Sequence, residues 1–273
     1  MKKWKLAGLL LSLILSGCAT TMPGSAIDTT GGRKVEYMLA GQGAPVVVFE
    51  NGLGATLDWW SQVWPATVAE SQALAYNRAG YGRSDASTGP RDGAHVVQEL
   101  RALLQARQLP PPYVLVGHSL GGLYMQLFAR QHPGEVAALV LVDSTHPDQV
   151  KGAGNPDQWP TWLKVAFRWT TSDTAKQELA ALDATGNQVS RLPVDPSVPV
   201  FVLSALRATG VPSALADDAS RKRAGIAHLY PGAVQVWVDS GHGIPLEKPE
   251  AVVGAIRAAV RAAGASRNAA GAQ

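Results

Sequence analysis

Short apolar runs alternate with amphipathic stretches and with glycine- and proline-rich turns from about residue 33 to 263. Four uninterrupted apolar runs have the length and the valine and leucine content of strands that are buried on both faces of a parallel sheet. These runs cover residues 45–49, 113–116, 138–142 and 199–203. Residues 92–107 carry apolar positions at helical spacing, and residues 33–39 alternate in the manner of an antiparallel edge strand. The pattern predicts one α/β domain, with a mostly parallel sheet and helices on both faces.

The periodicity weakens between Ser144 and Val198, where the composition shifts to Pro, Asp and Thr. A connection of about 55 residues is too long for a plain loop in a compact domain, so we expect a small helical lid inserted at about 144–198. Three tryptophans fall in this segment, namely Trp159, Trp162 and Trp169. Two interpretations of these side chains stay open: they form the core of the lid, or they line a wall for an apolar substrate.

A glycine-rich turn joins the strand at 113–116 to an amphipathic helix. Its sequence, Gly117-His118-Ser119-Leu120-Gly121, fits G-x-S-x-G. A serine in such a sharp turn has a strained backbone, so the residues two before it and two after it must lack bulk. Its hydroxyl is held clear of the sheet, where the N–H groups that begin the next helix suit a developing negative charge. Ser119 is therefore the candidate nucleophile.

A general base for Ser119 must come from elsewhere in the chain. Of the six histidines, His242 alone stands in a glycine-flanked loop directly after a predicted strand, at 234–238. An imidazole at that place can reach across the crevice at the carboxyl ends of the strands. His118 belongs to the turn itself and is expected to point elsewhere, and the other four histidines show no visible partner.

A carboxylate would hold the imidazole in its reactive tautomer and stabilise the imidazolium. Asp143 directly follows the strand at 138–142 and would face the same crevice as Ser119. Asp217 and Asp218 are the alternatives for this role.

The order Ser119, Asp, His242 is that of the α/β-hydrolase triad. Together with the Asn51-Gly52 turn, the arginine-rich loop at 78–84 and Ser240-Gly241-His242, it resembles the lidded, esterase-like branch of the α/β-hydrolase superfamily. In many relatives the acid follows the strand that corresponds to residues 199–203. Residues 204–210 contain no Asp or Glu, which favours Asp143, a position that some members use.

The resemblance also implies an oxyanion hole formed by the backbone amides of Leu53 and Leu120. The arginines of the loop at 78–84 are better explained by local salt bridges than by an anionic ligand. The implied reaction is the hydrolysis of small carboxylic esters with an apolar moiety, through an acyl-enzyme on Ser119. Thioester, amide and carbon–carbon bond hydrolysis use similar machinery, and a non-catalytic protein that uses the fold to bind a ligand or partner is the alternative from another class.

No metal-ligand cluster, phosphate loop or dinucleotide fingerprint occurs in the sequence, so no cofactor is expected. The 24 basic residues exceed the 21 acidic ones by three, and three lysines lie in the first five residues. A chain without those lysines is close to neutral, which gives no electrostatic footprint for nucleic acid.

The N-terminus has the pattern of a secretory signal. Lysines 2, 3 and 5 precede an apolar run at 6–15 that is too short to span a bilayer. The sequence Leu15-Ser16-Gly17-Cys18 then resembles the lipobox of bacterial lipoproteins, and Cys18 is the only cysteine. An ordinary cleaved signal with an incidental cysteine is the alternative.

The lipobox resemblance implies a signal peptide at 1–17 and a mature protein that is lipidated on Cys18. Ala19 stands where an inner-membrane retention signal usually has Asp, which favours the periplasmic face of the outer membrane over the inner membrane. Thr, Gly and Ser dominate the next residues, so 18–32 is expected to be a flexible tether. The hydrolase domain would then cover 33–263, and 264–273 would form a flexible tail.

Overall fold

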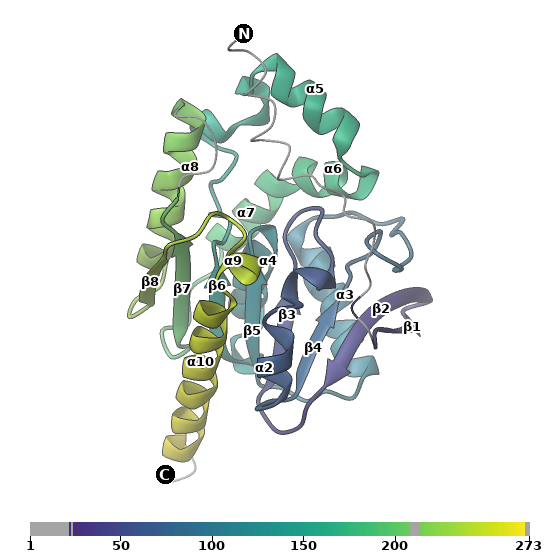
Figure 1. Ribbon diagram of the computed structural model, residues 1–273, viewed down its shortest axis with the longest axis vertical. Coiled ribbons are helices and arrows are strands. Elements are labelled where there is room, and N and C mark those ends of the chain that lie inside the picture. The colour runs from purple at the N-terminus through teal and green to yellow at the C-terminus, as the bar shows by residue number, and fades with distance from the viewer. Residues whose placement is uncertain (1–21, 23, 208–212, 271–273) are drawn as a thin grey trace.

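The computed structural model describes residue 22, residues 24–207 and residues 213–270 (Figure 1). The described chain folds around an eight-stranded sheet with the order β1-β2-β4-β3-β5-β6-β7-β8. The strands are β1 (Ala26–Thr30), β2 (Arg33–Ala40), β3 (Val46–Glu50), β4 (Ala73–Tyr76), β5 (Tyr113–His118), β6 (Val136–Val142), β7 (Val200–Ala205) and β8 (Val234–Val238). The six strands from β4 to β8 in this order run parallel, whereas β2 and β1 add an antiparallel edge. The predicted fold class is confirmed.

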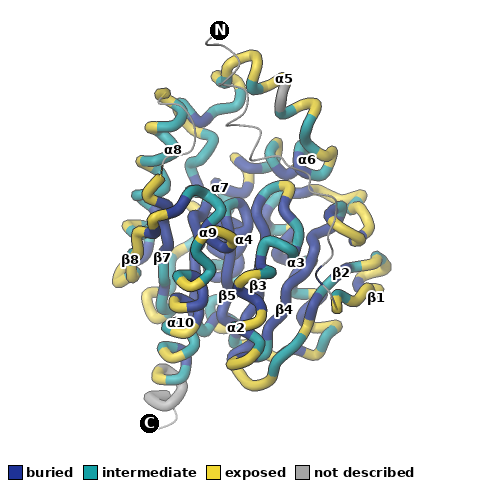
Figure 2. Tube along the Cα trace, in the orientation of Figure 1, coloured by how far each residue is buried: buried dark blue, intermediate teal, exposed yellow. Residues whose placement is uncertain are grey.

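Helices cover both faces of the sheet. They are η2 (Leu57–Trp60), α2 (Trp64–Val68), α3 (Gly93–Ala106), α4 (Leu120–Gln131), η3 (Pro133–Glu135), η4 (Gly152–Gly154), η5 (Pro156–Gln158), α5 (Thr161–Thr170), α6 (Asp173–Ala180), α7 (Leu182–Ser190), α8 (Ala214–Gly225), η6 (Ile226–Leu229), α9 (Ile244–Glu247) and α10 (Pro249–Ala270). Successive side chains of a strand point to opposite faces, so Val48 packs with α3 and α4 while Val47 and Phe49 pack with α2 and α10. Coverage on both faces explains why β3 and β5 are buried throughout (Figure 2).

The segment that connects β6 to β7 contains three α-helices, α5, α6 and α7, after the short helices η4 and η5. Figure 1 shows α5 and α6 beyond the carboxyl ends of the central strands. Trp162 and Trp169 on α5 are 55 % and 82 % exposed, so they neither form a lid core nor line a buried wall. Trp159 is half-buried, and its Nε1–H donates to the carbonyl of Gly154 at 3.1 Å.

The N-terminal part of the domain begins earlier than the sequence suggested. Residues 26–30 form β1, which pairs with β2 through the two-residue turn Gly31-Gly32. Both glycines have positive φ, of 58° and 78°, which is the conformation of a tight hairpin turn. The expectation of a flexible tether at 18–32 is therefore wrong for residues 24–32, because backbone pairing orders a strand whose side chains are mostly exposed. The expected signal peptide and Cys18 lie outside the described residues.

Two further observations concern the chain ends. Met22 is buried, and its N–H donates to Asp58 Oδ1 at 2.6 Å. The last helix, α10, continues to Ala270, so the expectation of a flexible tail from residue 264 is wrong as far as residue 270. Among the residues described, no helix is both long and apolar enough to cross a membrane.

Candidate active site

Ser119 lies between β5 and α4 in the strained backbone conformation that the turn requires, with φ 54° and ψ −123°. The neighbouring chain leaves no room for side chains at the flanking glycines. A Cβ on Gly117 would lie 2.6 Å from the carbonyl oxygen of Gly121, and a Cβ on Gly121 would lie 2.4 Å from that of Glu50. The glycines of the motif are thus required by close backbone packing.

The backbone ties Ser119 to the end of β6. Its N–H donates to the carbonyl of Val142 at 3.1 Å, and its carbonyl accepts from the N–H of Thr145 at 2.9 Å. Asp143 lies between these two residues and also has a positive φ, of 42°. Within the described chain, Gln108 is the only other non-glycine residue with positive φ. Two of the three strained residues therefore lie side by side at the candidate site, which is typical of functional positions.

Asp143 is the carboxylate that contacts His242, with 2.6 Å between Oδ2 and the imidazole Nδ1. Its other oxygen, Oδ1, accepts from the N–H of Ala205 at 3.0 Å and lies 2.7 Å from Arg223 Nε. Burial opposes ionisation of Asp143, but the hydrogen bond and charge of His242, together with the charge of Arg223, hold its pKa below the ordinary value. Asp143 is therefore a carboxylate at neutral pH.

The alternative acids lie on α8 and do not contact His242. Asp217 is exposed, and Asp218 pairs with Lys222 at 2.5 Å and with Arg221 at 3.2 Å. The geometry thus brings Asp143 to the imidazole, and leaves Asp217 and Asp218 on the helix surface.

His118 does not point away from the site, in contrast to the expectation from the sequence. Its ring lies 4.7 Å from that of His242 and stacks on Trp59 at 5.0 Å. Its Nε2–H donates to the carbonyl of His242 at 2.9 Å, which anchors the loop that carries the imidazole. Burial, followed by the proximity of His242, lowers the pKa of His118 to about 3, so this second histidine is neutral at physiological pH.

The two predicted oxyanion residues lie on the segments that flank Ser119. Leu120 is the first residue of α4, and Leu53 lies in the loop after β3. This loop passes close to the serine, because a Cβ on Gly52 would lie 3.1 Å from Ser119 Cβ. Arg78 stabilises this loop, because its Nη2–H donates to the carbonyl of Gly52 at 3.0 Å.

Arg78 is the centre of a buried ionic network. Its guanidinium donates to Glu50 Oε1 at 2.7 Å, and it forms two parallel hydrogen bonds of 2.9 Å with the carboxylate of Glu178 on α6. Tyr81 donates its hydroxyl to the same Glu178 carboxylate at 2.8 Å. Arg83 pairs with Glu36 at 2.9 Å, so the interpretation of the loop at 78–84 as a centre of salt bridges is confirmed.

Sequence reasoning missed Glu178 and Arg223, which lie in the lid and on α8. Each is an ordinary charged residue on a helix, so no local signal marks it. Only the packing of its helix within the folded domain brings it to the site.

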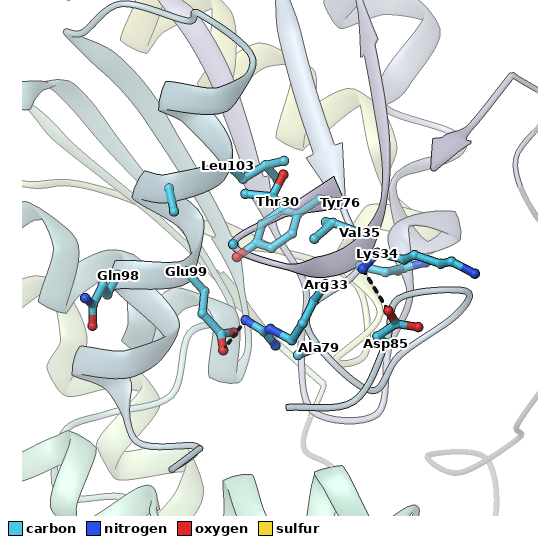
Figure 3. Close-up of a pocket in the computed structure, with 13 residues that line it drawn as sticks. Thr30, Arg33, Lys34, Val35, Tyr76, Ala79, Asp85, Gln98, Glu99 and Leu103 are labelled. Carbon is cyan, nitrogen blue, oxygen red and sulfur yellow. Dashed lines mark hydrogen bonds and ion pairs between the residues drawn. The ribbon is translucent and has the colours of Figure 1, made fainter. Parts of the chain in front are cut away.

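A cavity of about 210 Å³ lies elsewhere, between the β1–β2 hairpin and α3 (Figure 3). Arg33 and Glu99 in its lining form an ion pair at 2.7 Å, and the N–H of Lys34 donates to Asp85 at 2.8 Å. The lining contains neither Ser119 nor His242, and Arg33, Glu99 and Asp85 each have a partner. We therefore attach no chemistry to this cavity.

A sequence model described as alpha/beta hydrolase fold matches residues 45–240, which is most of the chain. The chain belongs to this family. Among curated relatives it is 33 % identical to the non-heme chloroperoxidase of Streptomyces lividans over 146 residues, which cover 52 % of each chain. It is also 33 % identical to the uncharacterized protein YqjL of Bacillus subtilis over 103 residues, or 38 % of this chain and 41 % of that one. The chain thus spans about half the length of the curated relatives it matches, or less.

Solved structures share the hydrolase fold. The thermophilic esterase from Thermogutta terrifontis superposes with a TM-score of 0.63 at 20 % identity, covering 88 % of this chain and 98 % of the esterase. The enol-lactonase from Burkholderia xenovorans gives 0.58 at 18 % identity, covering 86 % of this chain and all of the lactonase (100 %). At these identities the likeness concerns the fold alone.

Proposed function

We propose that the protein is a serine hydrolase that cleaves carboxylic esters through an acyl-enzyme on Ser119. The observation that carries this proposal is the 2.6 Å contact between His242 Nδ1 and the buried Asp143, formed beside a serine held at φ 54° in a strand-to-helix turn. A nucleophile, a base and a carboxylate that orients the base are the three parts that acyl transfer requires. The family supports a hydrolase, and the ester as substrate is our inference.

The chemistry follows from these groups. His242 Nε2 takes the proton of Ser119 Oγ as that oxygen forms a bond to the ester carbonyl carbon. The negative charge that moves to the carbonyl oxygen is stabilised by the amides of Leu53 and Leu120. The carbon–oxygen bond to the alcohol then breaks, and the alcohol leaves with the proton from His242. Water attacks the acyl-enzyme in the same way, releases the acid and restores Ser119.

Residues near the imidazole favour a substrate with an apolar moiety. Trp59 stacks on His118, and a Cβ on Gly243, next to His242, would lie 3.9 Å from the Trp59 ring. The indole therefore lies beside the loop of the general base, where it can contact an acyl or alcohol group.

A fluorophosphonate probe tests the nucleophile directly. We expect the wild type and the control Ser190→Ala, in which an exposed serine at the end of α7 is changed, to be labelled, and Ser119→Ala to remain unlabelled. An unlabelled wild type that is folded by circular dichroism would favour the non-catalytic binding protein.

The reaction type is tested with a panel of matched substrates. Nitrophenyl esters of increasing acyl length, the corresponding thioester and the corresponding anilide are offered to protein without residues 1–18. We expect turnover of the esters, abolished in Ser119→Ala. Faster cleavage of the thioester or anilide than of the ester, at equal acyl length, would overturn the ester assignment.

We also propose that the protein is anchored through lipid on Cys18 to a bacterial membrane, with the periplasmic face of the outer membrane favoured. The support is the Leu15-Ser16-Gly17-Cys18 sequence after a short basic and apolar leader. Wild-type protein should incorporate labelled palmitate and sediment with membranes, and Cys18→Ser should do neither. Membrane sedimentation of Cys18→Ser, without palmitate uptake by the wild type, would refute the anchor.

A further inference from the structure

The Asp143 carboxylate that contacts His242 also contacts a cation. Arg223, near the end of α8, places its Nε 2.7 Å from Asp143 Oδ1, while His242 contacts Oδ2. The side chain of Arg223 is 11 % exposed and that of Asp143 is fully buried. This contact therefore lies largely out of water, where it is weakly screened.

Each oxygen of Asp143 has a defined partner. The N–H of Ala205 donates to Oδ1 at 3.0 Å, so Oδ1 has one backbone donor in addition to its ion pair with Arg223. The hydrogen bond and the ion pair restrict the orientation of the carboxylate, and that orientation sets the direction from which Oδ2 receives the imidazole N–H.

Arg223 also changes the charge that His242 experiences. A guanidinium stays protonated throughout the working pH range of enzymes. Its positive charge offsets part of the negative charge of Asp143, which makes a second positive charge on the imidazole less favourable.

We propose that Arg223 is a positioning residue for the triad, which orients the Asp143 carboxylate and extends the activity of the His242 base toward mildly acidic pH. The role presupposes the hydrolase reaction proposed above, because it acts through Asp143 and His242 and does not require contact with the substrate.

Other charged groups face the same loop and are already compensated or neutral. His118, from the end of β5, is held neutral by burial. Glu247 on α9 accepts from the N–H of Gly241 at 3.0 Å and pairs with Arg207 at 2.7 Å. Asp239 is exposed at the end of β8, with 84 % of its side chain accessible, where solvent screens it. In the described chain, Arg223 is thus the cation that contacts the Asp143 carboxylate.

The test compares Arg223→Gln, Arg223→Lys and the control Arg221→Gln. Arg221 lies on the same helix, is 69 % exposed and pairs with Asp218. In Arg223→Gln we expect the acid limb of the kcat/KM profile for a nitrophenyl ester to move up by about one pH unit, with a roughly tenfold lower kcat. Arg223→Lys keeps the charge, so the midpoint of its acid limb should lie close to that of the wild type. Its kcat should recover only in part. Arg221→Gln should match the wild type.

A fall in kcat with an unchanged acid limb in Arg223→Gln would overturn the proposal and leave Arg223 a purely structural residue. A direct measurement separates this outcome from failure of the proposed function. NMR titration of the His242 ring, assigned with His242→Gln, needs no turnover and should show the same upward shift of its midpoint in Arg223→Gln. An unshifted titration refutes the role of Arg223 even if the protein proves inactive on esters, and a shifted titration in an inactive protein refutes the esterase alone.

Discussion

Glu178 links the lid to the loop that carries Leu53, and replacing it tests whether that link stabilises the fold. The side chain is fully buried on α6, and its two oxygens receive the parallel hydrogen bonds of Arg78 and the hydroxyl of Tyr81. In Glu178→Ala the Arg78 guanidinium would stay buried, and among the residues that the structure describes Glu50 would be its one remaining carboxylate within hydrogen-bond distance.

The expected loss follows from this burial. Removing one partner of a buried ion pair typically costs about 3–5 kcal/mol, because the remaining charge stays desolvated. For a domain of this size about 1 kcal/mol lowers the melting temperature by roughly 2–4 °C, so we expect a decrease on the order of 10 °C. Glu70→Gln is the matched control. Its pair with Arg257 is about half exposed, and a surface pair contributes about 0–1 kcal/mol.

Thermal unfolding followed by circular dichroism measures both variants. Activity provides a second measurement, because Arg78 also holds the carbonyls of Asn51 and Gly52, at 2.5 and 3.0 Å. With the Leu53 amide in its proposed role, Glu178→Ala should lower kcat more than it raises KM, because a looser loop then affects the transition state most. A melting temperature within about 2 °C of the wild type, or a loss no larger than that of Glu70→Gln, would refute this reasoning.

Three further predictions follow from burial and backbone geometry. Gly121→Ala should abolish probe labelling and lower the melting temperature, because its Cβ would lie 2.4 Å from a carbonyl oxygen; retained labelling would contradict the packing. Trp60→Ala, at a fully buried ring, should cost about 3–5 kcal/mol in urea unfolding, whereas Trp169→Ala, at an 82 % exposed one, should cost less than about 0.5 kcal/mol. Burial lowers the pKa of His118 to about 3. Between this value and pH 6.5, the imidazole is therefore protonated in the unfolded chain and neutral in the folded chain. This group therefore leaves the free energy of unfolding unchanged above pH 6.5 and lowers it progressively toward pH 3. The decrease is about 2 kcal/mol at pH 5. His118→Asn should show a shallower loss of unfolding free energy on acidification, and an equal slope would contradict the assignment.

The sequence by itself determined the features that depend on local physics. The turn around Ser119 could be predicted because a strained serine requires small neighbours at Gly117 and Gly121. All three residues lie within one motif of five residues. The buried strands could be predicted because coverage on both faces demands continuous apolar runs. The helical segment between β6 and β7 could be predicted because the connection is too long for a plain loop in a compact domain.

Tertiary structure decided which distant residues meet. Asp143 and His242 are 99 residues apart, and Arg78 and Glu178 are 100 apart, so strand order and helix docking bring each pair together. A single arginine on a helix has the same local pattern whether it faces solvent or a buried carboxylate such as Asp143, which is why the contact of Arg223 could not be predicted. The edge strand β1 was missed for a related reason: it is held by backbone hydrogen bonds to β2, and such bonds leave little trace in side-chain hydrophobicity.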